Sequence, residues 1–98
     1  LLNLKQNSDV NFIETANKSI SDIEECIINN DWKTMKSIAH KIKPSINQLE
    51  IVALKDIIYW LEIYDEDTIN KSLWIQNATT TIEVLKRVIS EFQAILDS

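Results

Sequence analysis

Apolar residues recur at alternating steps of three and four along much of the chain, which is the spacing of one face of an α-helix. The most regular segment is Asp31–Leu49, and Asp31 is a suitable N-terminal cap for it. Its apolar stripe comprises Trp32, Met35, Ala39, Ile42, Ile46 and Leu49. The pattern therefore predicts a helix with one buried face over this segment.

A first helix is predicted ahead of this segment. It would begin at an N-cap formed by Ser8 or Asp9, with residues 1–7 as a short extra helical segment before it. Asn29–Asn30 would end it, because asparagine tolerates the left-handed conformation that a helix end needs where glycine is absent. Its apolar stripe comprises Ile13, Ala16, Ile20, Ile23 and Ile27. So short a connection predicts that the two helices lie side by side and antiparallel.

Two further helices are expected over Ile51–Tyr64 and Ile69–Leu96. The acidic segment Asp65–Asp67 forms a solvated turn between them, and Asp67 or Thr68 caps the last helix. Their apolar stripes comprise Ile51, Leu54, Ile58 and Leu61 in the third helix, and Ala78, Ile82, Leu85, Ile89, Phe92 and Leu96 in the last.

Four amphipathic helices with short turns predict an all-α fold, an up-down antiparallel four-helix bundle. The 98 residues suffice for one such domain, residues 1–98, which we expect to be a monomer. Because the chain begins with Leu rather than Met, we interpret it as part of a longer protein. The expected core contains Trp32, Ala39, Ile42, Ile46, Leu54, Leu61, Leu85 and Ile89.

Composition excludes several classes of function. The chain has no glycine, which excludes the glycine-rich loops that hold nucleotide phosphates, and no apolar run long enough for membrane insertion. Its single cysteine, Cys26, allows no internal disulfide and is best interpreted as a packing residue in a cytoplasmic protein. A net charge of −5 disfavours nucleic acid as a partner. With one histidine and no cysteine pair, no metal site is expected.

The one histidine, His40, lies on the face of Asp31–Leu49 opposite the apolar stripe. At about 100° per residue it stands roughly 130° from the middle of that stripe, so we expect it to face water. Its neighbours on the helical wheel are Lys33, Lys36, Lys43, Pro44 and Asn47. Residues 31–43 carry four lysines and one aspartate, which makes this face basic in an acidic protein.

Pro44 stands inside the predicted central helix. Its nitrogen cannot donate to the carbonyl of His40 and its ring crowds that carbonyl, which costs about 3 kcal/mol at an ordinary interior position. Either one helix ends near Lys43 and another begins, or a single kinked helix continues. Because the apolar stripe stays in phase through Ile46, we favour the continuous helix.

The residues around His40 resemble the histidine-containing phosphotransfer (HPt) domains of bacterial two-component phosphorelays. Their motif is Ala-His-x-Leu-Lys-Gly-Ser, followed by a hydrophobic segment and a glycine. The matching residues are Ala39, His40, Ile42, Lys43 and Ser45, and later Leu61–Glu62. Pro44 replaces the first glycine. Glu50 stands where the second glycine is usual, and we expect a more open turn there.

The resemblance implies a phosphoryl carrier that accepts phosphate on His40 from a receiver-domain aspartate and passes it to another receiver. Lys43 lies on the same helix face and would neutralise the phosphoryl group. Lys36, Asn47 and Lys41 are further candidates for phosphoryl contact or receiver docking. No cofactor is expected on this domain, and Mg²⁺ would be bound by the partner receiver.

The resemblance implies no autonomous kinase activity for this domain, which would stand alone or end a hybrid sensor histidine kinase. Two alternatives remain open. The dimerisation domain of a sensor histidine kinase has the motif His-Glu-x-Arg-x-Pro, but here Lys41 follows His40 and the proline comes one position early. The other is a non-catalytic helical bundle that binds proteins and carries an incidental histidine.

Overall fold

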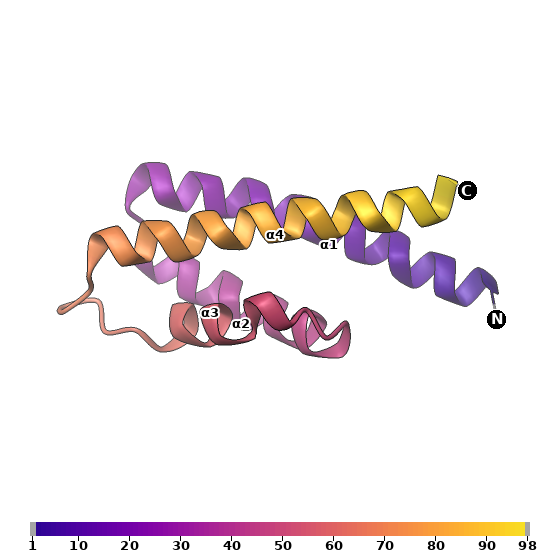
Figure 1. Cartoon of the computed structure of the whole chain (residues 1–98). Helices are drawn as coiled ribbons and strands as arrows, with labels where there is room; N and C mark the ends of the chain where they lie inside the picture. The colour runs from indigo at the N-terminus through magenta and orange to yellow at the C-terminus, as the bar shows by residue number, and fades with distance from the viewer. Residues whose placement is uncertain (1, 98) are drawn as a thin grey trace.

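The computed structural model describes residues 2–97, with side chains from Asn11 onward. Its four helices are α1 (Leu2–Asn29), α2 (Trp32–Gln48), α3 (Val52–Ile63) and α4 (Lys71–Asp97). Around the bundle α1 contacts α2, α2 contacts α3, α3 contacts α4, and α4 contacts α1 (Figure 1). The predicted all-α, antiparallel four-helix bundle is confirmed. Within residues 2–97, no helix combines the length and apolarity needed to cross a bilayer.

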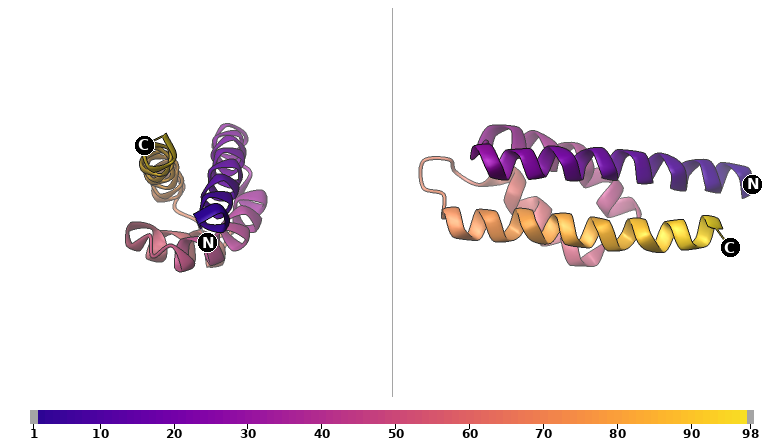
Figure 2. Two further views of the ribbon diagram at one scale, coloured as in Figure 1. Left: turned by 90° about the vertical axis from the view of Figure 1, so that its right-hand side faces the viewer. Right: turned by 90° about the horizontal axis from the view of Figure 1, so that it is seen from above.

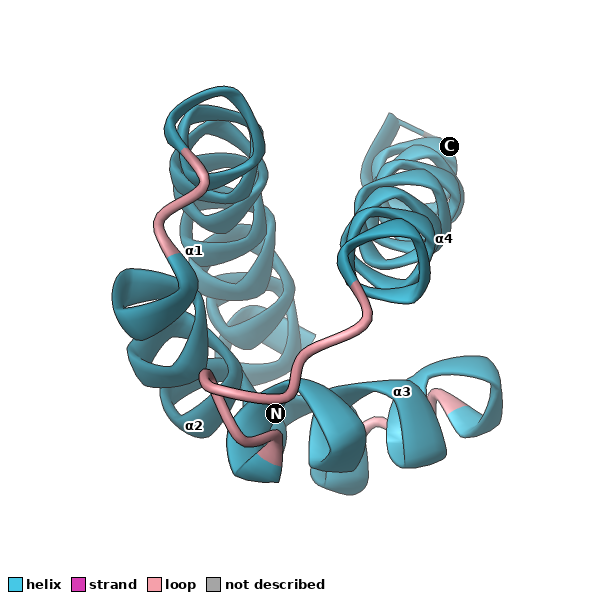
Figure 3. Ribbon diagram, turned by 90° about the vertical axis from the view of Figure 1, so that its left-hand side faces the viewer, coloured by secondary structure: helices cyan, strands magenta, loops and turns pink. Residues whose placement is uncertain are grey.

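The four helices differ in length, and this gives the bundle two unlike ends. At 1.5 Å per residue the 28 residues of α1 span about 42 Å, and the 12 residues of α3 span about 18 Å. The pair α1–α4 therefore extends beyond α2 and α3 at the end where the two termini lie (Figure 2). The α1–α2 turn and the α3–α4 loop both lie at the opposite end of the bundle, which faces the viewer in Figure 3.

The start of α1 differs from the prediction. The helix begins at Leu2 and runs without a break through Ser8 and Asp9, so neither residue caps it. Residues 2–7 of the expected extra N-terminal segment are the first part of α1 rather than a separate element, and Leu1 lies outside the described residues. The reason is that residues 2–29 contain neither glycine nor proline, and a serine or an aspartate costs a helix interior far less than either.

Both ends of the central helix are joined to their neighbours through a left-handed residue, Asn30 with φ 52° and Glu50 with φ 54°. Asn30 ends α1 as predicted. The Asp31 carboxylate accepts a hydrogen bond from the Thr34 N–H at 3.1 Å, which confirms it as the cap of α2. At Glu50 the expectation of a more open turn is wrong, because this residue adopts the tight conformation that favours glycine.

The α3–α4 connection is also capped differently from the prediction. α4 begins at Lys71, and the Asn70 carboxamide oxygen accepts the N–H of Leu73 at 3.0 Å, so the cap is neither Asp67 nor Thr68. Asp65 instead accepts the backbone N–H of Asp67 at 2.9 Å. The acidic segment thus forms a separate exposed turn, and α4 begins later in the sequence than predicted.

Most of the predicted core is buried. These residues are Ala39, Ile42, Ile46, Leu54, Leu61, Leu85 and Ile89. Trp32 is only half-buried, because it opens α2 at the edge of the bundle, and it packs edge-on against Trp74 with ring centroids 4.3 Å apart. Leu49, the last member of the α2 stripe, is exposed because the helix ends one residue earlier. Tyr64 and Trp74 were not predicted in the core but are buried.

The cysteine is part of this core. Cys26 is buried, and burial, followed by the nearby carboxylate of Asp31, raises the pKa of its thiol to about 11. A thiol that stays protonated near neutral pH is a poor nucleophile. Cys26 is therefore a packing residue, as predicted.

Candidate functional site

His40 projects from the outer face of α2, and 75% of its side chain is exposed. The adjacent Ala39 and nearby Ile42 are buried and fix the rotation of the helix, so that His40 points away from the core. α2 is continuous through Pro44, which confirms the favoured interpretation of one helix. The predicted exposure of His40 is also confirmed.

Glu62 of α3 lies against the imidazole ring. Its Oε1 is 2.8 Å from Nδ1 of His40, and only 17% of its side chain is exposed. An ionised carboxylate can only accept a hydrogen bond, so Nδ1 must carry the proton and donate it. A neutral ring with this tautomer has its lone pair on Nε2, and most of the His40 side chain is open to solvent.

Lys43 completes a three-residue network with Glu62. Its Nζ lies 2.8 Å from the second carboxylate oxygen, Oε2, so Glu62 bridges the lysine and the histidine. The Lys43 ammonium, and then the His40 ring, hold the pKa of Glu62 below its usual range. The carboxylate is therefore ionised at neutral pH. Lys43, predicted to stabilise phosphoryl charge, thus has its own charge balanced in this structure.

Lys36, one turn before His40, has a different kind of partner. Its Nζ lies 4.8 Å from the ring centroid of Tyr64, the residue that ends α3. The Tyr64 hydroxyl donates to the backbone carbonyl of Trp32, and burial is the main reason that its pKa rises to about 12. The ring stays neutral, so a cation–π contact holds the ammonium.

The other two predicted site residues stand apart from this network. Asn47 and Lys41 are exposed on α2, and within the described side chains neither forms a side-chain hydrogen bond or ion pair. Two residues that sequence reasoning did not assign to the site belong to it, namely Glu62 and Tyr64. For Glu62 a signal existed in the Leu61–Glu62 pair of the HPt motif, whereas Tyr64 gave none.

A depression of about 260 Å³ exists between α1, α2 and α4, and its lining does not include His40. It is lined by Asn11, Phe12, Thr15, Ser45, Gln48, Leu49 and Phe92. Comparison of this chain with protein-family models, with curated proteins and with solved structures finds no match.

Proposed function

We propose that the protein carries phosphoryl groups in a two-component phosphorelay, accepting them on His40 from a receiver-domain aspartate and passing them to another receiver. The observation that carries the proposal is the 2.8 Å contact between Nδ1 of His40 and the Glu62 carboxylate. It leaves Nε2 with an exposed lone pair, as a histidine nucleophile requires.

The chemistry balances with the groups present. The Nε2 lone pair attacks the phosphorus of an aspartyl phosphate, a P–N bond forms, and the P–O bond breaks with its electron pair remaining on the aspartate carboxylate. The imidazole becomes positively charged and keeps its Nδ1 proton. The Glu62 carboxylate accepts a hydrogen bond from the Nδ1–H of His40 and stabilises the positive charge of the imidazolium, as a carboxylate does beside a catalytic histidine. The reverse steps transfer the group to the next receiver.

The charge around His40 agrees with a protein donor. The face of α2 around His40 carries Lys33, Lys36 and Lys43, and of these only Lys43 is paired with a carboxylate among the described side chains. This basic face in a chain of net charge −5 would attract the phosphate-bearing surface of a partner. The proposal includes a cytoplasmic monomer that binds no cofactor itself, with Mg²⁺ on the receiver. A non-catalytic interaction bundle would have no need of the Nδ1–carboxylate contact.

The test is transfer from phosphorylated receiver domains in the presence of Mg²⁺. We expect a single acid-labile, alkali-stable label that is absent from His40→Gln, and no label from ATP alone. Glu62→Gln keeps a hydrogen-bond acceptor but removes the charge, and should slow transfer by about 10- to 100-fold. Undiminished labelling of His40→Gln would overturn the site, and no labelling of the parent by any receiver would favour an interaction bundle.

A further inference from the structure

The two lysines that flank His40 on α2 differ in how their charges are balanced. Lys43 has the Glu62 carboxylate 2.8 Å from its ammonium. Within the described side chains Lys36 has no carboxylate at ion-pair distance, and its contact is the neutral ring of Tyr64. The positive charge of Lys43 is therefore balanced by Glu62, whereas the positive charge of Lys36 remains available.

Helix geometry places Lys36 on the side toward which the histidine leans. Side chains of an α-helix tilt toward its N-terminus, so each covers the turn that precedes it. The ring of His40 therefore extends over the turn that contains Lys36, while Lys36 itself extends toward the turn that contains Trp32, where its ammonium meets the Tyr64 ring. Lys43 extends back toward His40 in the same way, and there it meets Glu62, which also binds Nδ1. A phosphoryl group on Nε2 would thus project away from the Glu62 side of the ring.

Tyr64 suits a cation that must be held near the site and then released. An aromatic face attracts an ammonium through its quadrupole, which is a weaker attraction than a charge-assisted hydrogen bond to a phosphoryl group. The ring is itself fixed, since Tyr64 is buried and its hydroxyl donates to the Trp32 carbonyl. Lys41, by comparison, is exposed and has no such support.

We infer that Lys36 is the residue that binds the phosphoryl group on His40, and that the Tyr64 ring holds the Lys36 ammonium one turn away until phosphorylation draws it to the histidine. Lys43 then acts as a positioning residue that keeps Glu62 ionised and in place behind Nδ1. This inference rests on the proposed function and assigns a phosphoryl-binding group within it.

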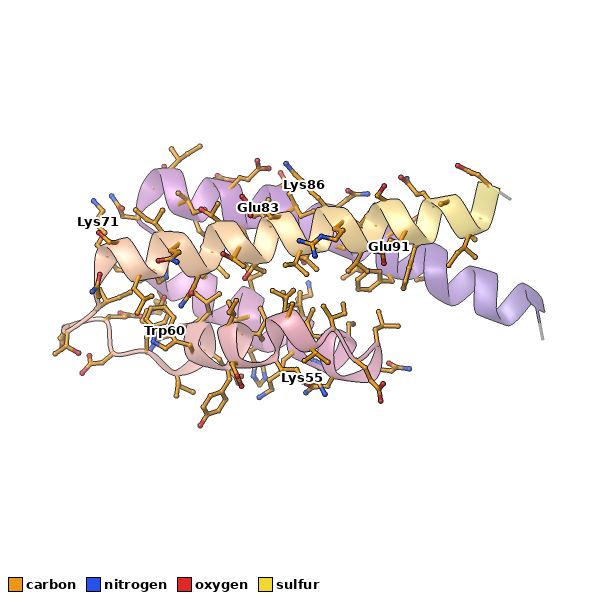
Figure 4. The ribbon with its side chains drawn as sticks, viewed as in Figure 1. Lys55, Trp60, Lys71, Glu83, Lys86 and Glu91 are labelled. Atoms are coloured by element: carbon orange, nitrogen blue, oxygen red, sulfur yellow. The ribbon has the colours of Figure 1, made fainter. Side chains whose placement is uncertain are left out.

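The kinetic test uses phosphoramidate, a small donor that requires no docking surface. Lys36→Met should be phosphorylated on His40 about 10-fold more slowly than the parent, less than for a fully enclosed site because solvent screens the charge. Lys36→Arg keeps the charge and should restore most of the rate. Lys55→Met is the matched control, because Lys55 is an exposed lysine on the outer side of α3 (Figure 4) and should react within about twofold of the parent.

A spectroscopic measurement separates phosphoryl binding from a structural role. In the resting protein the ε-methylene protons of Lys36 should resonate upfield of those of Lys55, because they lie over the Tyr64 ring. Phosphorylation should move the Lys36 signals toward ordinary lysine values, while the Lys43 signals change little.

The outcomes distinguish the two claims. If neither phosphoramidate nor any receiver labels the parent, both the proposed function and this inference are overturned. If the parent is labelled while Lys36→Met reacts at the parental rate, or the Lys36 signals do not move on phosphorylation, the inference alone is overturned. A slow Lys36→Met, rescued by Lys36→Arg and accompanied by the shift of the Lys36 signals, supports it.

Discussion

The turns at the two ends of α2 have the same backbone geometry but are formed by unlike residues. Before α2, the Asp31 N–H donates to the Cys26 carbonyl at 2.9 Å across the left-handed Asn30. After α2, the Ile51 N–H donates to the Ile46 carbonyl at 3.0 Å across the left-handed Glu50. Both have the six-to-one hydrogen bond of a Schellman motif.

The difference lies in what stabilises the left-handed residue. Asparagine tolerates this conformation, whereas for a residue such as glutamate it costs about 1–2 kcal/mol. At the second turn the compensation is tertiary, because Ile51 packs against the core and Ile46 is fully buried. At the first turn the following residue is Asp31, which caps α2 locally. One turn is thus specified by its own sequence and the other by packing.

The second turn matters for the candidate site because it sets the register of α3 against α2. Glu62 lies 22 residues after His40, and the chain reverses direction at Glu50 before α3 brings this carboxylate to Nδ1. Variants at the two turns therefore test both the stability and the alignment of the site.

The largest effect is expected at Ile46, where the packing that supports the second turn is removed. Ile46→Ala should lower the free energy of unfolding by about 2–5 kcal/mol, as large-to-small changes at buried positions do. Chemical denaturation followed by circular dichroism measures it. Ile28→Ala is the control, because Ile28 is 78% exposed on α1 and should change the free energy by less than about 0.5 kcal/mol. Equal losses for both variants would contradict the packing explanation.

A smaller effect of opposite sign is expected at Glu50. Glu50→Gly should raise the free energy of unfolding by about 0.5–1 kcal/mol, because relief of the left-handed strain exceeds the extra entropy of glycine in the unfolded chain. Glu50→Ala retains a Cβ atom and should show no such gain. Equal free energies of unfolding for Glu50→Gly and Glu50→Ala would contradict the explanation by left-handed strain.

The smallest effect is expected at Asn30. Asn30→Gly should change the free energy of unfolding by no more than about 0.3 kcal/mol, since asparagine already tolerates the left-handed region that glycine favours. The same denaturation series measures it beside Glu50→Gly. A gain at Asn30 as large as the gain at Glu50 would mean that the two turns do not differ in strain.

The candidate site was predictable in part. The exposure of His40 and the proximity of Lys43 follow from positions on one helix, where angular spacing is constant. The Glu62 contact required a second helix in a particular register. The resting position of Lys36 depended on Tyr64, whose ring reaches α2 only because α3 ends beside the start of α2.

By itself, the sequence determined the number of helices, their buried faces, the outward direction of His40 and the asparagine turn at Asn30. Each depends on residues a few positions apart, and helical periodicity expresses such relations directly. Only the tertiary structure decided that Glu50 adopts a left-handed conformation, that Trp74 is fully buried and that the Glu62 carboxylate contacts Nδ1 of His40. Those outcomes depend on the relative rotation and register of neighbouring helices, which the packing of all four helices sets together and no single helix contains.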